Sequence, residues 1–134
     1  MCIHKKGILR VNNITFRVQR YYLGMSAGRD AYLAHFFIVE DRKRENYANW
    51  YFGISRSLAA HYQIESKSPD FRKTIEDFLF KEGTKWLRNK IRENPTSLSS
   101  YLEGEEIILD TANYHKDFPI IRNDGTVDLP DPLE

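Results

Sequence analysis

The stretch Ala31-Tyr-Leu-Ala-His-Phe-Phe-Ile-Val-Glu40 has the pattern of a β-strand. Successive side chains of a β-strand point to opposite faces of a sheet, and here both alternating sets are apolar. The two sets are Leu33, Phe37 and Val39 on one face and Tyr32, Phe36 and Ile38 on the other. A strand that is apolar on both faces is normally central and covered on both sides. The sequence therefore predicts a sheet with this strand in its interior and a cover for each face.

Two shorter strands precede the central one. They are predicted over Ile8–Val11 and Ile14–Val18, and Asn12 and Asn13 separate them. Asn tolerates the positive φ that a two-residue hairpin turn requires, so the pair reads as a β-hairpin. The glycines of Gly24–Asp30 indicate a loop before the central strand.

A fourth strand follows the polar connection after Glu40. It is predicted over Tyr47–Ser55, where Trp50 and Ile54 share one face. Ser57 is a suitable capping residue for a short helix over Leu58–Tyr62.

The second half of the chain has the pattern of helices. Ser68-Pro69-Asp70 is a typical helix start, and apolar residues recur at helical spacings through Phe71–Arg92. Gly83 interrupts that pattern and predicts a kink or two abutting helices. A short helix over Ser97–Leu102 and a strand over Glu105–Asp110 complete the pattern.

These elements predict an α+β fold. An antiparallel sheet of about four strands packs against a long, Gly83-kinked helix or two helices, with an extended acidic arm at the C-terminus. We expect residues 1–110 to form a single α+β domain. The arm, residues 111–134, is rich in Pro and Asp and either packs on the domain or is partly disordered. The second face of the central strand is then covered by this arm, by a short helix, or by a second copy in a homodimer.

Composition narrows the location of the protein. The single cysteine, Cys2, cannot form an internal disulfide, and the first residues lack the apolar core of a signal peptide. No apolar run approaches the roughly 20 residues of a membrane span. We therefore expect a cytoplasmic protein without a membrane partner.

The formal net charge of +1 hides an uneven distribution. Residues 1–100 carry 18 Lys and Arg against 10 Asp and Glu, whereas residues 101–134 carry 2 against 9. The two parts therefore have net charges of +8 and −7. Segments of opposite sign are typical of a nucleic-acid surface with an acidic tail, and also of a self-complementary fold.

Two groups of cations are candidates for phosphate contacts, one in the connection between the third and fourth strands and one along a face of the long helix. They are Arg42, Lys43 and Arg44, and Lys81, Lys85, Arg88 and Arg92. Cations in a line can follow a phosphate backbone and release its counterions. Arg10 and Arg17 with Tyr21 or Tyr22 nearby could add stacking contacts to single-stranded bases. The alternative is that these cations only solvate an outer face, and that the acidic segment folds onto them.

Catalytic and cofactor motifs are absent from the sequence. The four histidines have no metal-ligand spacing, there is no glycine-rich phosphate loop, and we expect neither a metal nor a cofactor. His35 is expected to be buried and hydrogen-bonded. His61 with Glu40, Asp41 or Arg56 could form the acid–base site of a metal-independent nuclease or hydrolase if the fold brought them together.

The sequence favours a non-enzymatic protein that binds nucleic acid, or a nucleic-acid-bound complex, through its basic body, with the acidic C-terminal segment modulating access. One alternative is a small inhibitor, immunity or accessory module that binds a protein through the acidic segment. The further alternative is the metal-independent nuclease or hydrolase.

Overall fold

A computed structural model describes residues 5–61, 69–110, 120–121 and 127–128 of the chain. Its elements, in chain order, are β1 (Lys5–Val11), β2 (Ile14–Ser26), β3 (Ala31–Glu40), β4 (Tyr47–Ser55), α1 (Arg56–His61), α2 (Phe71–Glu93), α3 (Leu98–Tyr101), β5 (Glu105–Leu109), β6 (Ile120–Ile121) and β7 (Val127–Asp128). The fold is α+β, as the sequence predicts.

The main sheet has five strands in the order β1-β2-β3-β4-β5. β1 to β4 form an antiparallel meander, whereas β5 pairs with β4 in parallel. The expectation of a purely antiparallel sheet was therefore wrong. β5 is parallel to β4 because a helical crossover joins them. The chain leaves β4, passes through α1, α2 and α3, and then runs in the same direction as β4. β6 and β7 form a separate two-stranded ribbon.

The hairpin between β1 and β2 turns at Asn12 and Asn13, whose φ angles are 53° and 65°. This confirms the turn that the sequence predicts. β2 is longer than expected, since it runs through Gly24 to Ser26 and its register shifts between Tyr22 and Gly24. A β-bulge accommodates Gly24 within β2. Of the loop predicted over Gly24–Asp30, only the turn over residues 27–30 remains before β3.

α2 is one continuous helix of 23 residues that packs against a single face of the sheet. The expected kink or break at Gly83 is not confirmed. Gly83 instead allows close approach to β3, because a Cβ there would lie 2.5 Å from Cζ of Phe36. Phe36, Trp50 and Phe52 are fully buried beneath the helix and form the centre of the core.

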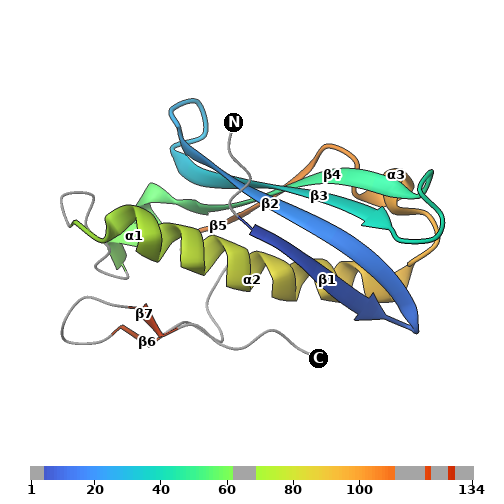
Figure 1. The fold of residues 1–134 in the computed structure, drawn as a ribbon. Helices are drawn as coiled ribbons and strands as arrows, with labels where there is room; N and C mark the ends of the chain where they lie inside the picture. Colours follow the sequence, from blue (N-terminus) through green and yellow to red (C-terminus); the bar gives the residue numbers. More distant parts are fainter. Residues whose placement is uncertain (1–4, 62–68, 111–119, 122–126, 129–134) are drawn as a thin grey trace.

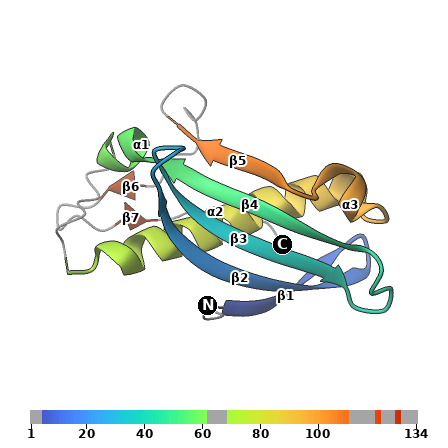
Figure 2. The ribbon, with the colours of Figure 1, turned by 90° about the horizontal axis from the view of Figure 1, so that it is seen from above.

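The opposite face of the sheet has no helix of the described residues over it. In Figure 1 α2 lies below the sheet, and in Figure 2, seen from above, the strands stand in front of the helix. We call this surface the open face. The arm expected to cover it, residues 111–134, lies outside the described residues except for β6 and β7.

α1 begins at Arg56, two residues before the expected start at Leu58, and its capping residue also differs from the expectation. The backbone N–H of Leu58 donates to Oγ of Ser55 at 3.0 Å, so Ser55 rather than Ser57 accepts the capping hydrogen bond. Ser55 and Ser57 both donate to Oδ1 of Asp110, at 2.6 and 3.1 Å. These bonds join the end of β4 to the residue that follows β5.

Candidate nucleic-acid interface

Arg42, Lys43 and Arg44 lie exposed in the connection between β3 and β4. A backbone bond from Asp41 N to Thr15 O at 2.8 Å holds the connection to β2, and one from Glu40 N to Asn46 O at 2.9 Å joins its two ends. The buried side chain of Asn46 also donates to the carbonyl oxygen of Pro95, after α2, at 2.9 Å. The connection is thus fastened to both β2 and the end of the long helix.

Arg17 joins this connection from β2. Its guanidinium donates to Asp41 Oδ1, and both side chains remain partly exposed. That hydrogen bond, assisted by the charges of Arg44 and Arg42, lowers the pKa of Asp41 below its ordinary value. Asp41 therefore stays ionised within a group of cations.

The predicted helix stripe does not form one exposed row. Lys81 is exposed, but Nζ of Lys85 lies 3.9 Å from Oε1 of the buried Glu82. Arg88 is only 7% exposed and donates through Nη1 to the carbonyl oxygen of Arg10 at 3.2 Å. Two members of the stripe thus make contacts inside the domain, and Arg88 has almost no surface to offer a phosphate.

Arg92, the last member of the stripe, is exposed close to the β1–β2 hairpin. Its carbonyl oxygen accepts a hydrogen bond from Nδ2 of Asn12 at 3.2 Å. The hairpin, the β3–β4 connection and the C-terminus of α2 therefore meet at the same end of the molecule (Figure 1). We call its exposed cations the basic end: Arg10, Arg17, Arg42, Lys43, Arg44 and Arg92.

Carboxylates also lie at this end. Asp41 is bonded to Arg17, and Glu40 Oε1 accepts from Nδ2 of Asn46 at 2.9 Å. Glu45 and Glu93 are exposed there. The basic end is therefore a mixed surface with an excess of cations.

On the open face, aromatic side chains form a stack across three neighbouring strands. The ring of His35 on β3 lies 5.4 Å from that of Tyr21 on β2 and 4.9 Å from that of Tyr51 on β4, with interplanar angles of 20° and 18°. Nε2 of His35 is 2.8 Å from Oδ1 of Asn49. Both faces of the imidazole are thus directed at tyrosines, and the stack presents mainly ring edges outward. His35 is half-buried rather than fully buried, and its expected hydrogen bond is present.

Tyr22, the second tyrosine named in the sequence prediction, lies on the face of the sheet that α2 covers. Tyr22 packs against the core on the helix side, where the guanidinium of Arg72 lies 5.6 Å from its ring centroid. Burial raises its pKa. Only Tyr21 is therefore on the same face of the sheet as Arg17.

The outer strands of the open face differ in charge. Lys6, Ile8 and Arg10 are exposed on β1, and Ile8 is 62% exposed. At the other edge Glu106 accepts a bond from Arg29, while Glu103 accepts bonds from N and Nδ2 of Asn49, both at 3.2 Å. The face therefore carries cations along β1 and β2, whereas at the other edge it carries the carboxylate of Glu103, just before β5, and that of Glu106, which is paired with Arg29.

The residues of the nuclease alternative do not meet. Glu40 is the last residue of β3 and Asp41 follows it. Arg56 and His61 are the first and last residues of α1, which begins next to the first residue of β3. The ten residues of β3 separate the two ends by roughly 30 Å. Arg56 instead pairs with Asp30 at 3.3 Å. Within the described residues, no group of three or more His, Cys, Asp and Glu could hold a metal ion.

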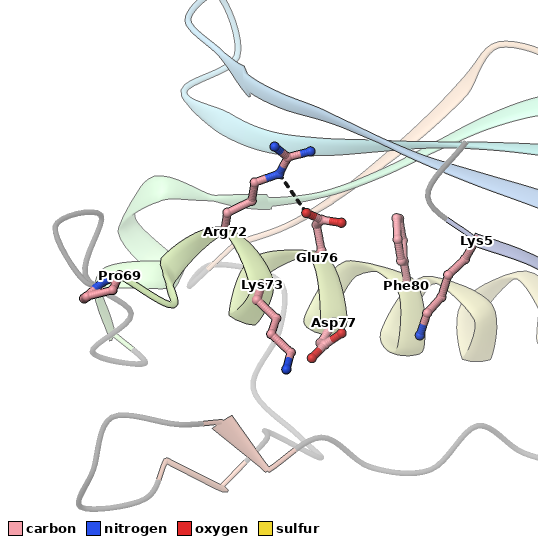
Figure 3. A pocket seen from close by; sticks show the side chains of 7 residues that line it. All are labelled: Lys5, Pro69, Arg72, Lys73, Glu76, Asp77 and Phe80. Atoms are coloured by element: carbon pink, nitrogen blue, oxygen red, sulfur yellow. Dashed lines mark hydrogen bonds and ion pairs between the residues drawn. The ribbon is translucent and has the colours of Figure 1, made fainter. Parts of the chain in front are cut away.

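A cavity of about 320 Å³ lies against the first half of α2, away from the basic end (Figure 3). It is lined by Lys5, Pro69, Arg72, Lys73, Glu76, Asp77 and Phe80. Arg72 and Glu76 point toward the sheet and are joined at 2.8 Å, whereas Lys73 and Asp77 point away from it. Charges of both signs line the cavity, so it does not select a phosphate by charge.

The acidic segment, residues 101–134, contacts the domain through three carboxylates. Glu103 accepts from Asn49, Glu106 from Arg29, and Asp110 from Ser55 and Ser57. Glu105 is exposed, and most of residues 111–134 lie outside the described residues. No described helix is long and apolar enough to cross a membrane.

Comparisons with protein-family models, with curated proteins and with solved structures find no match for this chain. Function therefore has to be argued from the arrangement of the side chains.

Sequence reasoning missed the aromatic stack and the location of the basic end. His35 and Tyr51 each lie at an outward position of a predicted strand, whereas Tyr21 lies beyond the predicted end of the second strand, which the structure extends to Ser26. The stack also depends on the register of three strands. Strand alternation could also have shown that Arg20 belongs to the interior. It lies three residues after Arg17 in the same strand, so its side chain points to the opposite face, which the helix covers. Its guanidinium lies 5.5 Å from the centroid of Phe80, and burial lowers its pKa.

Proposed function

We propose that the protein is a non-enzymatic nucleic-acid-binding protein that contacts the phosphate backbone through the basic end. The observation that carries this proposal is the convergence of exposed cations from four separate segments. Arg10 comes from β1, Arg17 from β2 and Arg92 from α2, while the β3–β4 connection supplies the Arg42–Arg44 run. Cations that neutralise phosphates release condensed counterions, which makes such binding favourable and dependent on salt.

Duplex nucleic acid fits this surface better than single strands do. Bases of single strands bind by stacking on free aromatic faces, but His35 has both ring faces directed at Tyr21 and Tyr51. Phosphate contacts carry no sequence information by themselves. We therefore expect binding that discriminates little among sequences.

The acidic C-terminal segment modulates access in this proposal. A chain ending at Asp110 would lose 2 cationic and 5 acidic residues, which changes the net charge from +1 to +4. If the segment competes with nucleic acid for the cations, the shortened chain binds more tightly than the full chain.

The experiment is fluorescence anisotropy with short labelled DNA and RNA, each single-stranded and duplex, at low and physiological salt. We expect duplex to bind at least as tightly as single strands, with an affinity that falls as salt rises. Absence of binding by the full and the shortened chain at low salt would eliminate the proposal.

A further inference from the structure

We infer that the open face is the interface of a homodimer, with the two-fold axis running in the interface approximately along β3. The occupant is a second copy of this chain, and charge complementarity across the sheet is the argument for it. This inference does not depend on the nucleic-acid proposal.

The composition of the open face is that of a protein interface. Tyr21, His35, Phe37 and Tyr51 occupy its centre, and Tyr47 is 44% exposed beside them. The rings of Phe37 and Tyr47 lie 6.0 Å apart. Aromatic residues are enriched in the centres of interfaces, and charged residues are confined to their rims.

The strand register places these side chains in rows across the sheet. One row runs from Lys6 through Gln19, Phe37 and Asn49, and Glu103 bonds to Asn49 at its far end. The next row contains the aromatic stack and ends at Glu106. The first row therefore has Phe37 at its centre and charges of opposite sign at its two ends, and the second row has an aromatic centre.

A two-fold axis along β3 reverses the strand order and keeps each row at its own level. It lays β1 over β5 of the second copy, so Lys6 faces Glu103 of the second copy and Gln19 faces Asn49 of the second copy. Phe37 meets its own symmetry mate. A two-fold axis across the strands would instead place the basic β1–β2 side over itself. Charge thus selects the first arrangement.

The available area is sufficient for a stable dimer. Five strands spaced by about 4.8 Å and a central strand of ten residues give roughly 600 Å² per copy and about 1,200 Å² in total. This lies at the lower end of the range for specific interfaces. We therefore expect a dimer that dissociates on dilution.

The dimer would also bring the β3–β4 connections of two copies together. Because the axis runs along the strands, the β1–β2 hairpins and β3–β4 connections of both copies point to the same end. Arg42, Lys43 and Arg44 of both copies then flank one symmetry axis, a geometry that suits the approximate two-fold symmetry of a duplex. Arg10 and Arg17 project from the open face itself and lie in or beside the dimer interface.

Sedimentation equilibrium of the full chain without nucleic acid tests the inference. We expect a concentration-dependent mass that approaches twice 15.8 kDa. Phe37→Asp should give a monomer with an unchanged far-ultraviolet circular dichroism spectrum, since Phe37 is half-buried on the open face. A wild-type chain that stays monomeric at all accessible concentrations overturns the inference.

Charge reversal locates the interface independently of Phe37. Lys6→Glu alone and Glu103→Lys alone should each raise the dissociation constant of the dimer about tenfold, and the double reversal should restore it. The two residues lie on opposite edges of one sheet, roughly 19 Å apart, so restoration within one copy is excluded. Lys73→Glu, on α2, is the matched control and should change nothing. A dimer that neither reversal weakens has another interface and contradicts the inference, whereas a dimer that binds no nucleic acid contradicts only the proposed function.

Discussion

The guanidinium of Arg88 on α2 donates to the carbonyl oxygen of Arg10 on β1 at 3.2 Å and is almost completely buried. A residue that the charge pattern predicts as a phosphate ligand thus joins the helix to the sheet. Arg88→Ala should therefore lower the free energy of unfolding by about 1–3 kcal/mol, because it removes buried packing and the hydrogen bond to the carbonyl oxygen of Arg10. Urea unfolding measures this, with the exposed Lys81→Ala as the control that should leave the midpoint unchanged. Equal effects of the two substitutions would contradict this structural role.

Gly83 gives a test of the helix–sheet packing. Gly83→Ala places a methyl group 2.5 Å from Cζ of the fully buried Phe36. Overpacking of about 1–3 kcal/mol should exceed the gain of about 1 kcal/mol in helix propensity. Thermal unfolding should show a lower midpoint for this variant. Gly28→Ala, with no atom within 4 Å of the added Cβ, is the control, and a stabilised Gly83→Ala would show that the helix can move away.

Asp41 should restrain nucleic-acid binding. Asp41→Asn removes a carboxylate that accepts from Arg17 and so makes that guanidinium available to phosphates. We expect a roughly fewfold increase in affinity for duplex at low salt and little change in stability, since the pair is exposed. Asp77→Asn, in the wall of the cavity, changes the net charge by the same amount and should leave the affinity measured by anisotropy unchanged. An equal gain in affinity for the two variants would show that net charge, rather than release of Arg17, controls binding, and would contradict this prediction.

Tyr101 predicts a change in stability at alkaline pH. Burial, and next the charge of Glu93, raises its pKa from 10.0 to about 12. The neutral hydroxyl, which donates to the carbonyl oxygen of Asn94, is therefore favoured in the folded state. Its stabilisation is fully present below pH 10 and is lost as the pH rises toward about 12. The difference in unfolding free energy between wild type and Tyr101→Phe should shrink across this window; a constant difference would contradict the assignment.

Much of the fold could be predicted because it depends on local patterns. The alternation in Ala31–Glu40 and Tyr47–Ser55 gives β3 and β4 with their observed bounds. The parallel pairing of β5 could not be predicted, since it depends on where three helices return the chain. Gly83 was misread because its function is set by Phe36, a residue distant in sequence.

The candidate interface was less predictable than the fold. The exposed Arg42–Arg44 run was identifiable as a cluster in sequence, but its proximity to Arg92 depends on the bonds that Asn12 and Asn46 make. Helical spacing placed Arg88 beside Lys85 correctly, yet spacing does not reveal which residues of a helix lie against the sheet.

If nucleic acid binds at the basic end, the cations of that end determine how the affinity measured by anisotropy depends on salt. Two variants with equal net charge should be compared with the full wild-type chain. One replaces Arg42, Lys43 and Arg44 by Ala, and the other replaces the exposed Lys5, Arg56 and Lys73, which lie outside the basic end. We predict that the first variant lowers the slope of log affinity against log salt by about two to three and that the second leaves it nearly unchanged. Equal slopes for the two variants would contradict the claim.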